Sequence, residues 1–174
     1  ALEFSVSMTP IREATRRLVS EGALAMSNSG RIRVPIIGAA RFEELSRIRI
    51  LLEPELAVRA IPRVHYALTE RLLSLIRQIE DMIEQENTQG YLKMNIEFHK
   101  LLYLRAHSPA MLALLETVWL QIGPTMKNFL QKNLGSLTAS NHRNIILALR
   151  SGDGSGLVEN VKRNIQSDLH FLNN

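Results

Sequence analysis

The sequence predicts a mainly α-helical protein with a small strand-containing segment near its N-terminal end. From about residue 40 onward, apolar side chains recur every three or four positions, which is the spacing of one face of a helix. That region shows no alternating strand pattern and no internal repeat. Before it, two short stretches that favour strands flank a polar turn. These observations favour a small N-terminal unit followed by an all-α antiparallel helical bundle.

Composition narrows the class of protein further. The 174 residues allow one or two domains with a sizeable core. No apolar run is long enough to span a bilayer and no secretory signal is present, so we expect a cytoplasmic protein without a membrane partner. The absence of cysteine excludes disulfides and thiolate metal sites. The net charge of +4 is small, so positive charge that binds a polyanion must act locally.

The first expected element is a helix over about residues 9–21. Thr9 is a favourable N-cap residue, Pro10 suits the first helical position, and Gly22 ends the helix. The side chains expected on its buried face are Ile11, Ala14 and Leu18. The arginines expected on the opposite side are Arg12, Arg16 and Arg17. A short capped helix with arginines near its start is suited to a DNA major groove.

A hairpin is expected next, with strands over residues 23–26 and 31–35. They flank the turn Ser27-Asn28-Ser29-Gly30, and Arg31 and Arg33 give the hairpin a basic edge. Helix and hairpin together predict a winged helix-turn-helix that binds DNA. On spacing alone, a solvated basic helix face explains the arginines equally well.

Six helices with short connections are expected after a linker over residues 36–40. They cover about residues 40–61, 67–86, 92–106, 109–134, 139–150 and 158–172. Pro62 should end the first of them, whereas Pro124 should kink the fourth without ending it. We expect turns at Thr88-Gln89-Gly90, at Gly135-Ser136 and over the Gly-rich residues 151–156.

A motif covers the first expected helix and the residues before it. It reads Leu2-Glu3-Phe4-Ser5-Val6-Ser7-Met8-Thr9-Pro10-Ile11-Arg12-Glu13-Ala14 and continues through Arg17-Leu18 and Glu21-Gly22. This motif resembles the DNA-reading segment of the GntR family of bacterial transcription regulators. Met8 stands where the family usually has an arginine, and Ser5 stands where it has a turn glycine. The resemblance places the start of the chain inside the second helix of the usual winged domain, so that the first helix is missing.

The resemblance implies a winged domain over residues 1–36 that reads double-stranded operator DNA as a homodimer. The residues that it assigns to DNA contact are Ser7, Thr9, Arg12, Arg16, Arg17, Asn28, Gly30 and Arg31.

Three further motifs lie in the helical region. They are Arg49-Ile50-Leu51-Leu52-Glu53, Asn95-Ile96-Glu97-Phe98-His99, and Asn141-His142-Arg143-Asn144-Ile145 followed by Ala148-Leu149-Arg150-Ser151-Gly152-Asp153. They resemble the signatures of the FCD effector domain, the all-helical module of one large GntR subfamily. The resemblance implies a domain over residues 40–174 that binds an effector and dimerises. Six helices instead of seven resemble the vanillate-regulator variant.

A ligand site is expected inside this bundle. Asn95 and His99 are one helical turn apart and share a face, and His142 shares a face with apolar neighbours. The resemblance implies that Asn95, His99, His142 and Asn164 hold a divalent metal, zinc or nickel, with a small carboxylate effector on or beside it. Asn95 replaces the usual Asp and Asn164 replaces the usual His, and an amide oxygen is a poor ligand for these metals. A loosely held metal, a metal-free polar pocket and two satisfied core histidines all remain open.

Arg49 is the expected anchor for an effector carboxylate, because a guanidinium binds a carboxylate bidentately. The alternative is an intrahelical ion pair with Glu53. We expect Trp119 and Phe129 in the core, and the histidines at positions 65, 107 and 170 at the surface. The expected function is a ligand-responsive transcription regulator without catalytic residues. Its rivals are a metal-dependent helical-bundle enzyme that uses His99 and His142, and a helical adaptor with a vestigial DNA-binding segment.

Overall fold

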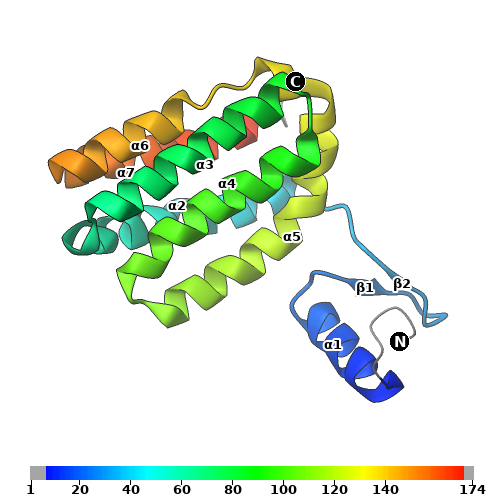
Figure 1. Cartoon of the computed structure of the whole chain (residues 1–174). Helices are drawn as coiled ribbons and strands as arrows, with labels where there is room; N and C mark the ends of the chain where they lie inside the picture. Colours follow the sequence, from blue (N-terminus) through cyan, green and yellow to red (C-terminus); the bar gives the residue numbers. More distant parts are fainter. Residues whose placement is uncertain (1–6, 171–174) are drawn as a thin grey trace.

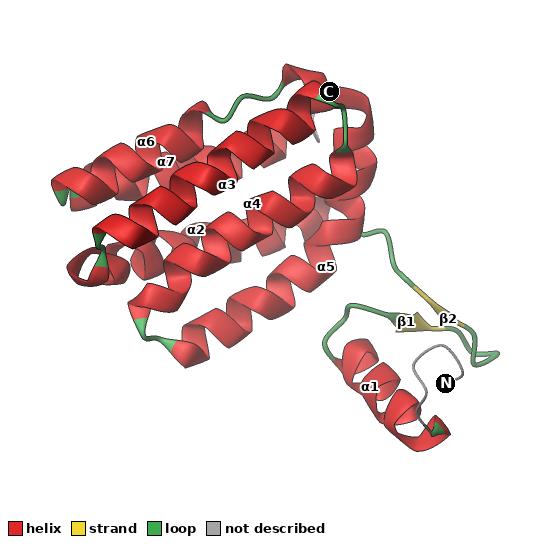
Figure 2. Ribbon diagram, viewed as in Figure 1, coloured by secondary structure: helices red, strands yellow, loops and turns green. Residues whose placement is uncertain are grey.

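A computed structural model describes residues 7–170 of the chain, and motif residues 2–6 lie outside that range. Six helices, α2 to α7, pack into one bundle, and a smaller unit made of α1 and a two-stranded hairpin lies beside α5 (Figures 1 and 2). The elements are α1 (Met8–Ser20), β1 (Ala25–Met26), β2 (Ile32–Arg33), α2 (Ala39–Ala60), α3 (Tyr66–Glu84), α4 (Thr88–Tyr103), α5 (Pro109–Asn133), α6 (Ser140–Ser151) and α7 (Gly154–His170). Short 3-10 turns follow α2, α4 and α5 at Ile61–Arg63, Leu104–Ala106 and Leu134–Ser136.

The bundle has a continuous apolar core. Helix α2 packs against α7 and α5, α3 packs against α4, and α6 packs against α7. Side chains that are fully buried at its centre include Phe42, Leu56, Leu72, Ile76, Phe98, Leu102, Leu115, Ile145 and Val161. The prediction of a mainly α bundle is therefore confirmed. None of the described helices is both long and apolar enough to cross a membrane.

Two segments predicted as turns belong wholly or partly to the helices that follow them, because a side chain caps each of these helices at its start. The segment Thr88-Gln89-Gly90 is the first turn of α4, since Asn87 Oδ1 accepts a hydrogen bond from the Gly90 N–H at 2.9 Å. Helix α7 already begins at Gly154, where Asp153 Oδ1 accepts from the Gly156 N–H at 2.9 Å. Both predictions treated glycine as a residue that breaks a helix, and they missed the capping side chain that precedes it.

Proline has different effects at different positions. Helix α2 ends just before Pro62, as predicted, and α5 runs through Pro124, also as predicted. Pro54 lies inside α2, where it is buried. Packing in the bundle therefore keeps α2 and α5 helical through Pro54 and Pro124, although each missing N–H group weakens its helix locally.

Among residues 7–36, the described part of the small N-terminal unit, no side chain is fully buried. Helix α1 begins at Met8, so Thr9 is not its N-cap, and the cap position is taken by Ser7, whose side chain makes no capping bond. Gly22 ends the helix region with a φ of 73°, as predicted. Ala14 is exposed and Ile11 and Leu18 are only half-buried, so the predicted buried face is wrong.

The physical reason is the small size of the elements. The strands are two residues long, and Ala25 pairs with Arg33 and Met26 with Ile32 in antiparallel register. Such a ribbon cannot cover a helix. The described residues leave an apolar groove of about 450 Å³ between α1 and the hairpin. Its lining includes Met8, Ile11, Thr15, Val19, Met26 and Ile32.

Candidate functional site

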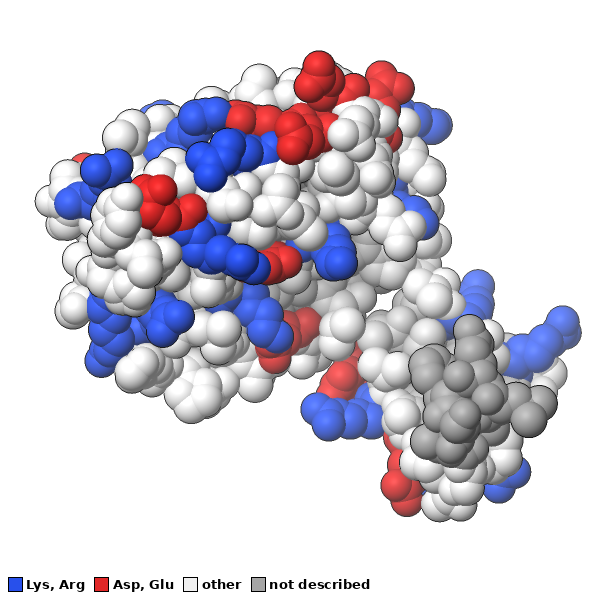
Figure 3. Space-filling model, in the orientation of Figure 1, with Lys and Arg blue, Asp and Glu red and all other residues white. Residues whose placement is uncertain are grey.

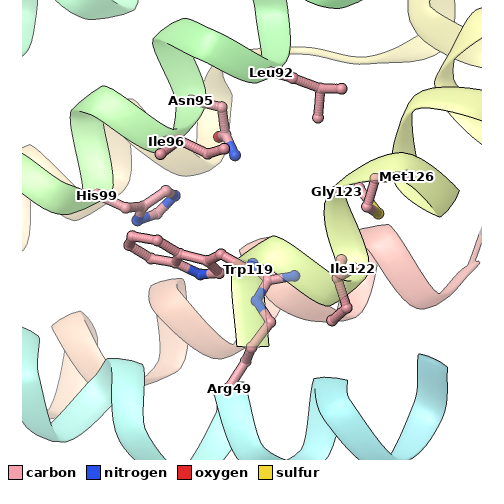
Figure 4. A pocket seen from close by; sticks show the side chains of 9 residues that line it. All are labelled: Arg49, Leu92, Asn95, Ile96, His99, Trp119, Ile122, Gly123 and Met126. Atoms are coloured by element: carbon pink, nitrogen blue, oxygen red, sulfur yellow. The ribbon is translucent and has the colours of Figure 1, made fainter. Parts of the chain in front are cut away.

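A buried ion pair lies on α2 at the centre of the bundle. Arg49 Nε donates to Glu53 Oε1 at 2.7 Å, and the two residues are 4% and 0% exposed. The intrahelical pair considered from the sequence is therefore present. The guanidinium also points into a small cavity between α2, α4 and α5 (Figure 4).

Glu53 is held by partners from two other helices. Tyr103 Oη on α4 donates to Glu53 Oε2 at 2.9 Å, and Trp119 Nε1 on α5 donates to Oε1 at 3.1 Å. Burial alone would raise the pKa of Glu53, but the charge of Arg49 and the hydrogen bonds from Arg49 and Trp119 outweigh burial and hold the pKa below its ordinary value. Burial and the neighbouring Glu53 raise the pKa of Tyr103. The carboxylate is thus ionised and fixes α2, α4 and α5 around the cavity.

His99 continues this network toward α7. Its Nδ1 lies 3.1 Å from Tyr103 Oη, and its Nε2 lies 3.1 Å from Asn164 Oδ1. A neutral imidazole carries one N–H group, so His99 donates either to Tyr103 Oη or to Asn164 Oδ1, and the tautomer decides which of the two.

His142 on α6 forms a second imidazole–amide pair. Its Nε2 lies 2.8 Å from Asn95 Oδ1, and the two histidine rings are 5.4 Å apart. Its Nδ1 is buried and has no hydrogen-bond partner among the described residues. Burial lowers the pKa of His99 to about 4 and that of His142 to about 3, so both imidazoles are neutral near pH 7.

The cavity itself is small. Its volume is about 40 Å³, enough for a few water molecules. The lining side chains come from α2, α4 and α5, and they are Arg49, Leu92, Asn95, Ile96, His99, Trp119, Ile122, Gly123 and Met126 (Figure 4). Ile96 and Trp119 also line an outer groove of about 320 Å³, together with Lys100, Glu116 and Leu120. An organic molecule larger than a few waters must therefore displace cavity side chains, and Ile96 and Trp119 are the residues shared by both spaces.

The structure brings the sequence-predicted site residues together in two layers. Arg49, Asn95 and His99 line the cavity, whereas His142 and Asn164 are bonded to Asn95 and His99 and do not line it. Sequence reasoning missed the parts played by Tyr103 and Trp119. Tyr103 is four residues after His99 and so shares its helix face, which was an available signal. The contact between Trp119 and Glu53 joins residues far apart in the chain and left no such signal.

The donor chemistry fits zinc or nickel poorly. The four predicted ligands offer two imidazoles and two neutral amides, with no anionic ligand among them. Within residues 7–167, no three His, Cys, Asp or Glu side chains are grouped so as to hold a metal ion. The nearest carboxylate, Glu53, is already bound by Arg49, Tyr103 and Trp119.

A second candidate surface lies on the small N-terminal unit, where Arg side chains project at several points (Figure 3). Arg12 and Arg16 are exposed, lie one turn apart and line the edge of the apolar groove. Arg17 lies elsewhere on the helix, and its Nε is 2.8 Å from Glu21 Oε1. The remaining predicted DNA contacts in this unit are all exposed, namely Ser7, Thr9, Asn28, Gly30 and Arg31. The structure thus groups Arg12 with Arg16 and separates both from Arg17.

Comparison with known proteins identifies the family. The model of the FCD domain matches residues 44–167, which is most of the chain. The chain belongs to the FCD-domain transcription regulators of the GntR family. The HTH-type transcriptional regulator McbR of Escherichia coli (strain K12) is 27% identical to this regulator over 172 residues, which cover 95% of this chain and 78% of McbR.

Two further matches agree. The gluconate operon transcriptional repressor of Bacillus subtilis (strain 168) is 25% identical over 94% of this chain and 70% of its own length. The solved structure of E. coli McbR/YncC has the same fold, with a TM-score of 0.87 and 24% identity over 97% of this chain and 85% of that one. These relatives are transcription regulators, not enzymes, which removes the metal-dependent enzyme from the rival functions.

Proposed function

We propose that this regulator binds operator DNA as a homodimer in the cytoplasm and that a small organic acid modulates the binding. The observation that carries the DNA-binding part is the placement of α1 outside the bundle, with its arginines exposed and the hairpin directly after it. A helix of this size fits a major groove, and the hairpin is the wing. Residues 1–36 form the winged domain and residues 40–174 the effector domain.

In this proposal, Arg12 and Arg16 read base edges from one face of α1. Ser7 and Thr9 at the helix start, together with Arg17, contact phosphates, since helix N-termini and arginines are suited to that role. Asn28, Gly30 and Arg31 at the hairpin tip bind the neighbouring backbone.

The effector site is the cavity in the bundle. An effector carboxylate accepts hydrogen bonds from the Arg49 guanidinium, which Glu53 holds in place, and Asn95 supplies an amide beside it. The buried Nδ1 of His142 offers a further polar atom behind the cavity. The bundle of α2 to α7 supports the six-helix vanillate-type variant as part of this proposal.

We propose further that the site works without metal, because its two amides replace the charged and imidazole ligands that zinc or nickel needs. Elemental analysis of purified protein tests this directly. Stoichiometric zinc or nickel that is lost in both His99→Ala and His142→Ala variants would establish the metal site and overturn the metal-free proposal.

The test of DNA binding begins with duplexes that the regulator selects from a random pool. Fluorescence anisotropy at fixed salt should show specific binding to the selected duplex, and native mass spectrometry should show two protein copies on each one. Failure to select any duplex, with the bundle intact by circular dichroism, would favour the helical adaptor instead.

A further inference from the structure

Helix α5 contacts both functional parts of the regulator. Trp119, Ile122, Gly123 and Met126 line the cavity. Between them in the sequence, Gln121 and Thr125 contact the N-terminal unit and its linker. One stretch of two helical turns therefore separates the effector cavity from the DNA-reading unit.

Gln121 forms a hydrogen bond with the end of α1. Its Nε2 donates to the carbonyl oxygen of Glu21, the C-cap residue of α1, at 3.0 Å. Its Oε1 accepts from the Arg41 guanidinium at 3.2 Å. Gly22 lies so close that an added Cβ would be 3.0 Å from Gln121 Cδ. The amide therefore fits closely against the turn that ends α1.

Thr125 holds the linker one helical turn further along. Its Oγ1 accepts from the Ile37 N–H at 3.0 Å, and the residue is 1% exposed. Because α1 has no buried side chain, the N-terminal unit shares no apolar core with the bundle through that helix. The hydrogen bonds to Gln121 and Thr125 are thus well placed to set its orientation.

The same stretch of α5 is a weak part of the helix. Pro124 lacks an N–H group, so the carbonyl oxygen of Leu120 loses its helical partner beside Gly123. Helices bend most readily at such places. A cavity of about 40 Å³ must widen to admit an organic acid, and α5 supplies a large part of its wall.

We propose that Gln121 and Thr125 are positioning residues that transmit filling of the cavity to the DNA-reading unit by movement of α5. This inference rests on the proposed function for its biological meaning, but its structural content is independent of DNA and effector. When the cavity fills, α5 shifts at residues 119–126 and carries the turn after α1 and the linker with it.

The test measures a distance between the two units. The chain has no cysteine, so cysteines introduced for Glu13 on α1 and Gln78 on α3, both exposed, take spin labels at those two positions alone. Double electron–electron resonance then gives the distance distribution, with labelled protein diluted in unlabelled protein so that a second copy does not contribute. Gly123→Leu adds a side chain at the cavity wall without an effector, since Gly123 lines the cavity and a Cβ there meets no atom within 4 Å.

We expect Gly123→Leu to shift the distribution in the otherwise unchanged chain. Gly123→Ala adds less volume and favours the helix by about 1 kcal/mol, a figure for an exposed helix interior, so it is the variant to use if the leucine disturbs folding. In a Gln121→Ala/Thr125→Val background the distribution should be broad, and Gly123→Leu should no longer shift it. Gln131→Ala, an exposed glutamine on the same helix, is the matched control and should leave the shift intact.

Two outcomes would overturn the inference. One is no shift from either Gly123 variant in a folded protein. The other is a shift that persists undiminished in the Gln121→Ala/Thr125→Val background. Failure of the proposed function gives a different pattern, because a regulator that selects no duplex can still show the distance shift. Where a duplex is selected, the double variant should bind it but lose the change in affinity that Gly123→Leu causes.

Discussion

At the level of single residues, the carboxylate of Glu53 organises the proposed effector site. It accepts hydrogen bonds from Arg49, Tyr103 and Trp119, and it is completely buried. Removing one partner of a buried charge pair is costly, because the remaining charge keeps its desolvation cost. The main effect of the ion pair between Arg49 and Glu53 is therefore to fix the geometry around the cavity. Its net contribution to the stability of the fold is small.

Glu53→Gln should lower the free energy of unfolding by about 3–5 kcal/mol, the usual cost of breaking a buried ion pair. Urea unfolding followed by circular dichroism measures it. The matched control is Glu55→Gln on the same helix, where Arg59 Nε lies 2.6 Å from a half-exposed Glu55. Solvent screens that pair, so its loss should cost no more than about 1 kcal/mol. Equal effects of the two substitutions would contradict the central place given to Glu53.

The two buried histidines predict a loss of stability in mild acid. Burial lowers their pKa values from 6.5 to about 4 and about 3, so the unfolded chain takes up protons first as the pH falls. Stability is then fully present above pH 6.5 and declines from there toward pH 4, by on the order of 1 kcal/mol per pH unit for each histidine. The lowered pKa of Glu53 adds to the decline in more acidic solution.

Urea midpoints between pH 7.5 and 4.5 test this linkage. His142→Gln should flatten the pH dependence, whereas Leu147→Ala, at an exposed position on the same helix, should leave its slope unchanged. A slope that is identical in all three proteins would show that the His142 imidazole does not resist protonation.

At the level of elements, α1 places its arginines on different sides of the helix. Arg12 and Arg16 lie one turn apart along the groove, while Arg17 is bound to Glu21 on another side of the helix. Helical geometry, with about 100° between successive residues, separates Arg17 from Arg16 although they are neighbours in sequence.

Arg12→Ala should weaken binding to the selected duplex by about 1–3 kcal/mol, roughly 5- to 150-fold, if Arg12 contacts a base edge. Arg17→Ala should weaken selected and random duplexes to a similar, smaller extent, because a phosphate contact carries no sequence information. Salt-controlled anisotropy titrations measure both. An unchanged affinity of Arg12→Ala for the selected duplex would count against α1 as the reading helix.

At the level of the whole molecule, Trp119 links the inside of the bundle to its surface. It lines both the small cavity and the outer groove, and its indole N–H is bonded to Glu53. It is also the single tryptophan of the chain. Its fluorescence therefore reports directly on events at the proposed effector site.

We expect a small carboxylate from a panel of organic acids to change the fluorescence of Trp119, and the corresponding primary amide to do so much more weakly. Gly123→Leu should abolish the response by occupying the cavity, whereas Leu147→Ala, at an exposed position on α6, should not. An equal response to acid and amide would contradict Arg49 as a carboxylate anchor.

Local patterns in the sequence determined the helices and the candidate residues. Periodic apolar residues placed all six bundle helices, and Gly22 and Pro62 marked real helix ends, because these signals act within a few residues. Spacing on one helix also found Asn95 with His99 and Arg49 with Glu53. Where a side-chain cap overrode a glycine, at Asn87 and Asp153, the boundary was misplaced.

The tertiary structure decided which of these residues meet. Glu53 contacts Tyr103 and Trp119, and His142 contacts Asn95, across 47 to 66 positions of sequence. Helix periodicity fixes which face is apolar, but helix packing chooses the partner for a polar side chain on that face. The same reason applies to Gln121, whose contact with Glu21 joins two units 100 positions apart. The sequence by itself determined the family and its candidate chemistry, and only the packing of α5 between the cavity and the N-terminal unit joined the two.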